Sequence, residues 1–555
     1  MKRILVFALS ALAVLAALAQ PKDAWKATAT LTAYDAQGTA VYSGPTFFVS
    51  ADGTIVAPYS AFQKAVRAEV ADVKGKRYAV SRILGASENY DMVRATTEAR
   101  PSDFLAPIAD STAVATAGTH LYAVGYSRVK KEKPVDATVT KATPYDGARF
   151  YEISLADAKF AGCPLIDAAG RVVAIVSQHT GEALDIRFAT ALAITANSAF
   201  DRELRSLPMA KAIPADKDEA QKYITLLDAL SPTDALVAMD DFVAAHPDNP
   251  TGYTTRAARR AAQHDYRGAA ADYEAALRHA NNETPADAVH YAFSRSLYNA
   301  ATNDAEAATA AGWTYERALQ EADAAQTAKP APVYVMQQGS CLYALERYGE
   351  AYNKYTAVNR TELASDETFF TAALALERAG GDSTQILALM DSVIARQERP
   401  YTQRAAGYFL ERAGRLVRYG QHRRAVQDYN EVEHIIGPRN LTDTFYYLRE
   451  QSELQAHMYQ QALDDIQSAT LSAPAERKPY YQTEEAFIYL TCGEYESAKA
   501  PAEAALAALP DNVDALRVLG VACGETGDKV RALECLKKAK ALGDINVDTL
   551  IAKYQ

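Results

Sequence analysis

Gly493-Glu-Tyr-Glu-Ser-Ala498 recurs 34 residues further on as Gly527-Asp-Lys-Val-Arg-Ala532, and this repeat decides how the second part of the chain is organised. Between and around the two copies, apolar residues recur at intervals of three and four, which is the period of an amphipathic α-helix. Similar units lie upstream, each with a turn followed by an alanine and, in several units, an aromatic residue four positions after it. They include 265–273, 347–355 and 420–429. The spacing predicts a series of stacked helix pairs.

The recurring alanine marks each predicted unit. Its positions are Ala235, Ala269, Ala311, Ala351, Ala425, Ala462, Ala498 and Ala532. One further, degenerate unit spans 361–396. Small residues such as Ala486 and Gly520, which precede the last two turns, allow the two helices of a pair to approach closely. We therefore expect about nine helix pairs over 216–545, followed by a C-terminal tail, 546–555.

The pattern resembles the tetratricopeptide (TPR) repeat. That resemblance implies an all-α solenoid with a long groove for protein or peptide partners. In TPR proteins some positions of each unit tend to face the concave side. Here they hold the candidate groove residues Met336, Tyr343, Tyr447, Tyr480 and Phe487. Large apolar side chains at these positions could equally be packing residues.

The first part of the chain has a different residue composition and periodicity. Residues 20–207 contain short runs rich in β-branched and aromatic residues, separated by Gly, Asp, Pro and Asn. Examples are 46–49, 54–56, 120–124 and 171–176. Many short strands at close spacing predict an all-β barrel or sandwich. The segment 208–215, bounded by Pro208 and Pro214, is the predicted linker to the helices.

Three blocks of the β region resemble HtrA-type, trypsin-like serine proteases. The segment 44–62 resembles the block that ends in the general base. The stretch from Ala79 to Ala95 resembles the block that carries the orienting aspartate. The segment 159–175, with Pro164-Leu165 and Gly170-Arg-Val-Val, resembles the nucleophile block. The resemblance implies a trypsin-like double β-barrel. The predicted fold class is therefore multidomain, with an N-terminal all-β double barrel followed by an all-α TPR solenoid.

Carried over position by position, the catalytic triad is incomplete. The base position is Ser60, the aspartate position is Asp91 and the nucleophile position is Ala161. A serine protease needs an imidazole to accept the hydroxyl proton and an oxygen to attack the carbonyl carbon. Ala161 has no nucleophilic atom, and a serine hydroxyl is not basic enough to replace histidine. Lys159 also replaces a glycine whose backbone N–H helps to form the oxyanion hole. The sequence therefore predicts a pseudoprotease.

Other interpretations stay open at this point. A register slip would make Cys163 a nucleophile, although the residues around it favour a small apolar residue in a tight turn. His120 and His179 are expected to be strand or loop residues rather than displaced bases. The favoured function is an adaptor that binds protein or peptide partners. An active endopeptidase with TPR-mediated substrate recruitment and a structural spacer in an envelope assembly are the alternatives.

The N-terminus has the layout of a secretory signal peptide. Lys2 and Arg3 precede an apolar run, 4–19, which ends in Ala17-Leu18-Ala19. Small residues at this spacing are typical of a signal-peptidase site. We expect a signal peptide over 1–19, a mature chain that begins near Gln20, and a periplasmic or secreted location. No other segment is apolar for long enough to cross a membrane.

Composition excludes several classes of function. The 555 residues carry a formal net charge of −11, which argues against a dedicated nucleic-acid-binding protein. The nine histidines are scattered and no two of the five cysteines have CxxC spacing, so we expect no metal site. No glycine-rich phosphate loop follows a strand, and we expect no cofactor.

Overall fold

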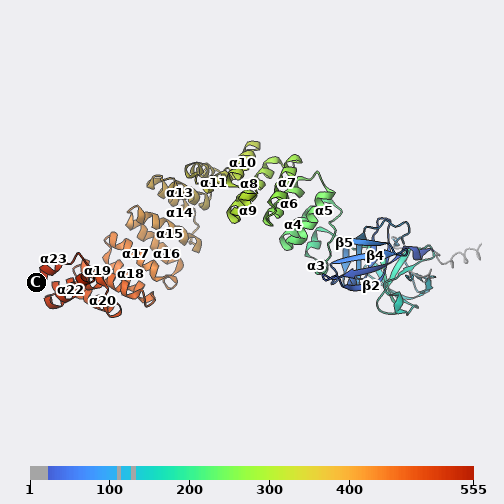
Figure 1. Cartoon of the computed structure of the whole chain (residues 1–555), viewed down its shortest axis with the longest axis horizontal. Helices are drawn as coiled ribbons and strands as arrows, with labels where there is room; N and C mark the ends of the chain where they lie inside the picture. The colour runs from blue at the N-terminus through green and yellow to red at the C-terminus, as the bar shows by residue number, and fades with distance from the viewer. Residues whose placement is uncertain (1–22, 109–113, 127–132) are drawn as a thin grey trace, which may run out of the picture. The chain divides into compact units, whose positions relative to one another are not determined.

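The structure is a computed structural model that describes residues 23–108, 114–126 and 133–555. The predicted signal peptide, 1–19, and its cleavage site lie outside the described residues. The chain divides into two compact units, Met1–Trp313 and Thr314–Gln555. The strands, blue to cyan in Figure 1, all belong to the first unit, and the helices from α4 onward follow them along the chain.

The first β element is a closed six-stranded barrel with the strand order β1-β2-β3-β6-β5-β4. Alternation sets its inner face: in β1, Ala29, Leu31 and Ala33 are buried while the intervening residues are partly exposed. The strands are β1 (Thr28–Tyr34), β2 (Ala40–Phe48), β3 (Ile55–Ala57), β4 (Arg67–Asp72), β5 (Arg77–Ser87) and β6 (Met92–Thr97).

The turn between β2 and β3 depends on Asp52-Gly53. Asp52 Oδ1 accepts a hydrogen bond from the Thr54 backbone N–H at 2.9 Å. Gly53 adopts a φ of +87°, and a Cβ at this position would lie 2.4 Å from the Ala99 carbonyl oxygen. Only glycine therefore fits here. The turn directs β3 toward the loop that carries Ser60.

The second β element is a seven-stranded sheet in the order β8-β7-β11-β12-β13-β10-β9, which the described residues do not close into a ring. Its hydrophobic core is contiguous and includes the fully apolar strand β12. The strands are β7 (Tyr122–Ala123), β8 (Val135–Asp136), β9 (Val139–Tyr145), β10 (Ala148–Ile153), β11 (Pro164–Ile166), β12 (Val172–Val176) and β13 (Glu182–Asp185).

The rest of the chain is helical, so the predicted order of an all-β region followed by an all-α region is confirmed. Every helix in the described part of the chain is too short or too polar to cross a bilayer. The first unit contains α2 (Ile186–Thr190), α3 (Arg202–Ser206), α4 (Lys217–Leu230), α5 (Pro232–Ala245), α6 (Pro250–Ala262), α7 (Tyr266–Arg278), α8 (Ala286–Asn303) and α9 (Ala305–Ala310). The second contains α10 (Tyr315–Ala328), α11 (Pro332–Ala344), α12 (Tyr348–Val358), α13 (Asp366–Arg378), α14 (Ser383–Ala395), α15 (Gln403–Arg418), α16 (His422–Ile436), α17 (Asp443–Gln455), α18 (Tyr459–Ser472), α19 (Lys478–Thr491), α20 (Tyr495–Ala508), α21 (Val513–Glu525), α22 (Lys529–Ala541) and α23 (Asp548–Tyr554).

The segment 208–215, predicted as a linker, is bound to the barrel. The Ile83 N–H donates to the Ala210 carbonyl, and the Ala212 N–H donates to the Ile83 carbonyl, so the segment pairs with β5. Side chains of α4 and α5, among them Ile224 and Phe242, share one hydrophobic core with the barrel. The first helix pair and the barrel are therefore packed together.

The recurring alanine is the fourth residue of the second helix of its pair; in α14 this residue is Ile386. Seven of the eight predicted positions lie in such helices and are fully buried. Ala311 is the exception, because it is exposed at the end of the short helix α9. Ala318, the buried fourth residue of α10, has the place that we assigned to Ala311. The inserted helix α9 is rich in alanine and therefore has a sequence similar to that of a repeat. The assignment of Ala311 as a recurring alanine was wrong.

A buried arginine–aspartate pair connects the two helices in three of the pairs. Each arginine lies on the first helix, and its guanidinium makes two hydrogen bonds to an aspartate 16 residues later on the second. Each arginine also binds an acidic side chain of the preceding helix at 2.7–2.8 Å. The pairs are Arg256–Asp272, Arg412–Asp428 and Arg449–Asp465.

Removing one partner of such a pair leaves a buried charge without compensation. We predict that Arg412→Met lowers the free energy of unfolding by roughly 3–5 kcal/mol, because Asp428 then stays buried without its cation. The double variant Arg412→Met/Asp428→Leu should recover most of the loss. Arg347→Ala, which removes the solvent-exposed ion pair with Glu350, should cost less than about 1 kcal/mol. Urea unfolding followed by circular dichroism measures all three; equal effects of the two single changes would contradict the prediction.

Candidate functional site

A cleft of about 440 Å³ lies in the first unit between loops of the two β elements. The barrel contributes the short 3₁₀ segment Tyr59–Ala61 and the turn between β5 and β6. The second sheet contributes Gly162 and the residues around the turn from β12 to β13. Ser60 and Asp91, two of the predicted triad positions, line this cleft, and Gly162 follows the third, Ala161.

Asp91 binds the backbone of Ser60. Its Oδ1 accepts a hydrogen bond from the Ser60 N–H at 2.9 Å, and its Oδ2 lies 3.5 Å from the Ser60 hydroxyl oxygen. Asp91 itself has a φ of +45°, a strained value for a residue other than glycine. Burial raises the pKa of nearby Tyr42 to about 12, and the charges of Asp91 and Cys163 add to this effect. The carboxylate therefore positions the loop that carries Ser60.

Two backbone N–H groups of the loop at Ala161 donate hydrogen bonds to acceptors within the same loop. The Lys159 N–H donates to Asp157 Oδ1 at 3.1 Å, and the Ala161 N–H donates to the Ala158 carbonyl at 3.1 Å. The Lys159 N–H is the group at the position that the resemblance assigns to an oxyanion hole. The Lys159 ammonium also forms an ion pair with Asp157 at 2.9 Å. The segment Ala158–Phe160 is a 3₁₀ turn closed by these bonds.

The other candidate residues of the β region lie in separate places. His179 lines the cleft, where its backbone N–H donates a hydrogen bond to the Ser177 hydroxyl at 3.1 Å. His120 lies away from the cleft, where its Nδ1 is 2.9 Å from Asp136 Oδ2. Cys163 is buried and does not line the cleft. Within the described residues, no group of three or more His, Cys, Asp or Glu side chains is arranged to hold a metal ion.

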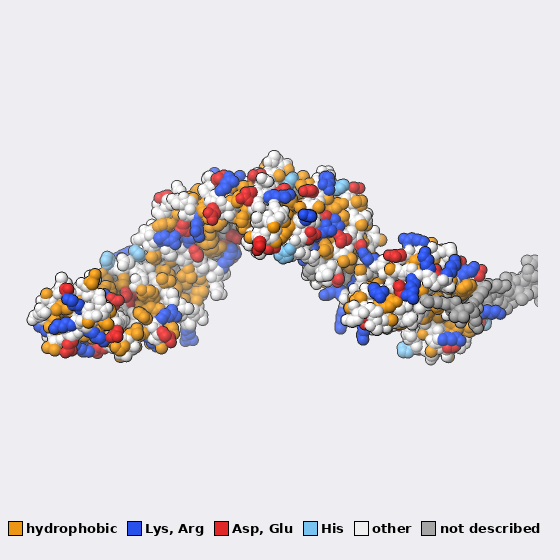
Figure 2. Space-filling view, in the orientation of Figure 1, with side chains coloured by type: hydrophobic (Ala, Val, Ile, Leu, Met, Phe, Trp, Pro, Cys, Tyr) orange, Lys and Arg blue, Asp and Glu red, His pale blue; other side chains and the backbone are white. Residues whose placement is uncertain are grey.

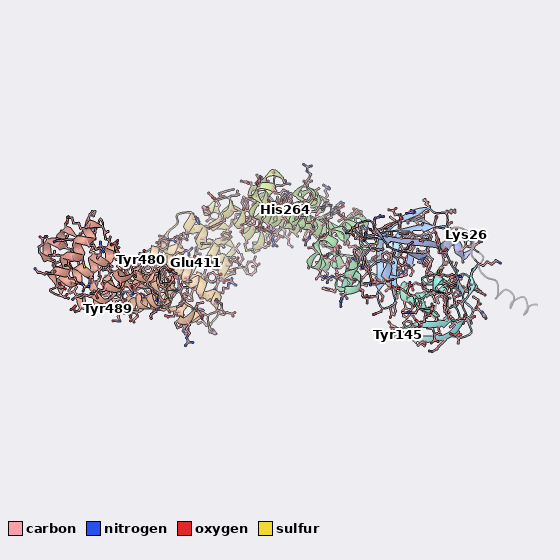
Figure 3. All side chains as sticks on the ribbon, turned by 60° about the horizontal axis from the view of Figure 1, so that its bottom comes forward. Lys26, Tyr145, His264, Glu411, Tyr480 and Tyr489 are labelled. Carbon is pink, nitrogen blue, oxygen red and sulfur yellow. The ribbon has the colours of Figure 1, made fainter. Side chains whose placement is uncertain are left out.

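A second cavity, of about 590 Å³, lies in the second unit on α17, α19 and α21, each the first helix of its pair. Three predicted groove residues, Tyr447, Tyr480 and Phe487, line it together. The side chains of Tyr480 and Phe487 are 60% and 47% exposed, which is high for large aromatic groups. Tyr480 and Tyr489, both labelled in Figure 3, lie nine residues apart on α19 and so project from opposite sides of the helix. The space-filling view in Figure 2 shows hydrophobic side chains among charged ones on the C-terminal helices.

The two arginines of this cavity are held by acidic side chains. Arg477 lies 2.9 Å from Asp443, and Arg517 lies 2.6 Å from Asp544 and also pairs with Asp514. Glu484 differs from them. Its carboxylate accepts one hydrogen bond, from Gln451 Nε2 at 3.3 Å, and forms no ion pair within the described part of the chain.

Next to Glu484, and connected to it through Gln451, lies an acidic cluster. It is formed by Glu450, Glu453 and Asp465 near Arg449. Glu450 is fully buried, and burial raises its pKa to about 8, with the charge of Glu484 adding to the effect. Burial likewise raises the pKa of Glu453 and of Glu484. Glu450 Oε2 accepts a hydrogen bond from Gln451 at 2.9 Å, whereas its Oε1 has no partner among the described residues.

Met336 and Tyr343 do not line this cavity. Both lie on α11, where Tyr343 packs against the ring of Tyr348 at a centroid distance of 5.2 Å. The polar residues of the cavity, above all Glu484, were not among the predicted groove residues. The spacing of Tyr480, Glu484 and Phe487 at i, i+4 and i+7 puts them on one face of α19 and could have indicated it.

Comparison with known proteins finds solved structures of similar fold, but it finds no protein family that matches this chain. No protein-family profile matches the chain, and no curated protein matches it. Among solved structures, the C-terminal part of a TPR repeat-containing protein from Cytophaga hutchinsonii is 14% identical, with 48% of this chain and 99% of that chain covered and a TM-score of 0.35. YrrB, described as a TPR protein with an unusual peptide-binding site, is 17% identical over 36% of this chain and 98% of its own, with a TM-score of 0.29.

The β region has its own similar structure, the HtrA-type protease AlgW solved with a tripeptide. The identity is 17% and the TM-score 0.26, and the match covers 32% of this chain and 60% of that chain. The chain thus spans about three fifths of the length of that protease chain. Both kinds of protein that the sequence resembles are therefore among its structural neighbours.

The buried carboxyl of Glu450 predicts a dependence of stability on pH. Its pKa is higher in the folded state than in the unfolded state, so the folded state holds the proton more tightly. Stability is then greatest below the unfolded pKa of about 4.5 and falls as pH rises toward 8. Glu450→Gln keeps the neutral form and should raise the unfolding midpoint at pH 8 by about 5 °C, with less effect at pH 5.

Thermal unfolding followed by circular dichroism between pH 5 and pH 9 tests this expectation. The matched control is Glu485→Gln, which removes the same charge from α19 outside the cavity. An identical pH dependence for Glu450→Gln and the unsubstituted protein would show that Glu450 is ionised in the folded state.

Proposed function

We propose that this protein is an exported, non-catalytic scaffold that binds protein or peptide segments through its C-terminal helical unit. The observation that carries the proposal is the cavity on α17, α19 and α21. It brings together Tyr447, Tyr480 and Phe487, and the rings of Tyr480 and Phe487 are exposed to a degree unusual for large aromatic groups. Exposed aromatic side chains in a concave site are typical anchors for a bound segment.

The loss of protease activity is the second part of the proposal. It is supported by the absence of an oxygen at Ala161 and of an imidazole at Ser60. It is also supported by the backbone donors of Lys159 and Ala161, which are both engaged within their own loop. An oxyanion hole needs such donors free and directed at the developing negative charge.

Export is the third part, and it rests on the sequence of the N-terminus. A positively charged start, an apolar run and Ala17-Leu18-Ala19 are typical of a cleaved signal peptide. Protein isolated from its native host should begin at or near Gln20. Recovery of the bulk of the protein with Met1 would contradict export by this route.

Absence of serine-hydrolase chemistry can be tested directly. We expect that a fluorophosphonate probe forms no adduct with the β region of the full chain, because no activated serine is present. If mass spectrometry located an adduct on Ser60 or another serine of the cleft, the active endopeptidase would replace our proposal. Loss of that adduct in His179→Ala would then identify His179 as the base.

Peptide binding can be tested with dodecapeptides selected by phage display on the full chain. For a selected peptide, Tyr480→Ala and Phe487→Ala should each weaken binding by roughly 1–3 kcal/mol, because each removes an aromatic anchor. The matched control is Leu471→Ala, which removes an apolar side chain that is 83% exposed and lies outside the cavity. Circular dichroism checks that the fold is kept. Equal affinities for all three variants and the unsubstituted protein would contradict the proposed site.

A further inference from the structure

We propose that the cavity on α17, α19 and α21 recognises a cationic side chain, lysine or arginine, of the bound segment. The aliphatic stem would lie against Tyr480 and Phe487, and the charged end would meet Glu484. This inference rests on the proposed function and specifies the chemistry of its partner.

The aromatic part of the site matches the stem of such a residue. Tyr480 and Phe487 lie seven residues apart on α19, and Glu484 lies between them on the same face. Tyr447 faces them from α17, where its ring is 5.5 Å from that of Tyr481. Long basic side chains place their methylene groups on apolar surfaces and keep the charge at a polar edge. Aromatic faces also attract the cation directly.

The charges of the site favour a cation over an anion. Both arginines of the lining have acidic partners, and Arg517 has two of them. Of the charged residues in the lining, Glu484 is the one that forms no ion pair within the described residues. A carboxylate or phosphate of a ligand would therefore meet an uncompensated negative charge at Glu484. An ammonium or guanidinium group would supply the charge that Glu484 lacks.

The groups behind Glu484 point to the same chemistry. Gln451 Nε2 donates to both Glu484 and Glu450, so one amide connects the lining to the buried cluster. Glu450 Oε1 has no hydrogen-bond partner in the described part of the chain, although the residue is fully buried. Burial raises the pKa of Glu484, and a bound cation would lower it again, since ionisation would then be compensated.

An array of random dodecapeptides, probed with the labelled full chain at physiological salt, tests the inference. Peptides that contain lysine or arginine should bind more strongly than matched peptides in which norleucine or citrulline replaces the basic residue. Glu484→Gln should reduce this preference on the order of tenfold, because it removes the charge that the cation meets. Glu485→Gln makes the same change of net charge one residue away and should leave the preference unchanged.

The outcomes separate the inference from the proposed function. If peptides bind and Tyr480→Ala weakens them, but norleucine replaces lysine without loss, the site binds peptides and the cationic specificity is wrong. If Glu484→Gln and Glu485→Gln reduce the preference equally, the effect is the overall negative charge, and the inference again fails. If no peptide binds above background, the proposed function itself is wrong.

Discussion

A largely buried guanidinium connects three consecutive helices at three places in the helical part, and the packing of those helices depends on it. In α6–α7, α15–α16 and α17–α18 an arginine binds an aspartate of the next helix with two hydrogen bonds and an acidic side chain of the preceding helix with a third. The planar fork of arginine fits this geometry, because it donates in several fixed directions at once. Small residues such as the buried alanines allow helices to come close, and the arginine fixes their register.

Helix α19, which carries Glu484 and both exposed rings of the candidate cavity, belongs to a pair that lacks this connection. In α19–α20 the positions that correspond to the arginine and the aspartate are Glu485 and Pro501. The neighbouring Glu484 is therefore not engaged by a buried cation from its own pair. A repeat that departs from the stabilising pattern thus leaves a carboxylate and exposed rings available. Functional sites are often found where such local consistency is broken.

Much of this organisation could be predicted from the sequence. Helix pairs follow from the spacing of the recurring alanines, and the order of β region and helices follows from the change of period near 208–215. Ala311 was wrongly assigned as a recurring alanine, because the inserted helix α9 is itself rich in alanine and its sequence is similar to that of a repeat. Glu484 was missed because an acidic residue on an amphipathic helix looks like a solvated surface residue. Its burial arises from the packing of α17 and α21, which no local pattern encodes. The internal bonds of the Lys159 and Ala161 N–H groups likewise depend on backbone conformation rather than on residue type.

The shared core of the barrel with α4 and α5 bears on how such a chain can evolve. A stack of repeats has an apolar surface at each end that must be covered. At one end α23 provides the cover, since Tyr554 packs into the core of the last repeats. At the other end the barrel does so, because Ile224 and Phe242 belong to its own core. Whole repeats can be gained or lost between these two ends without exposing new apolar surface. The junction itself cannot be exchanged in this way, because removing the first helix pair would expose the core that it shares with the barrel.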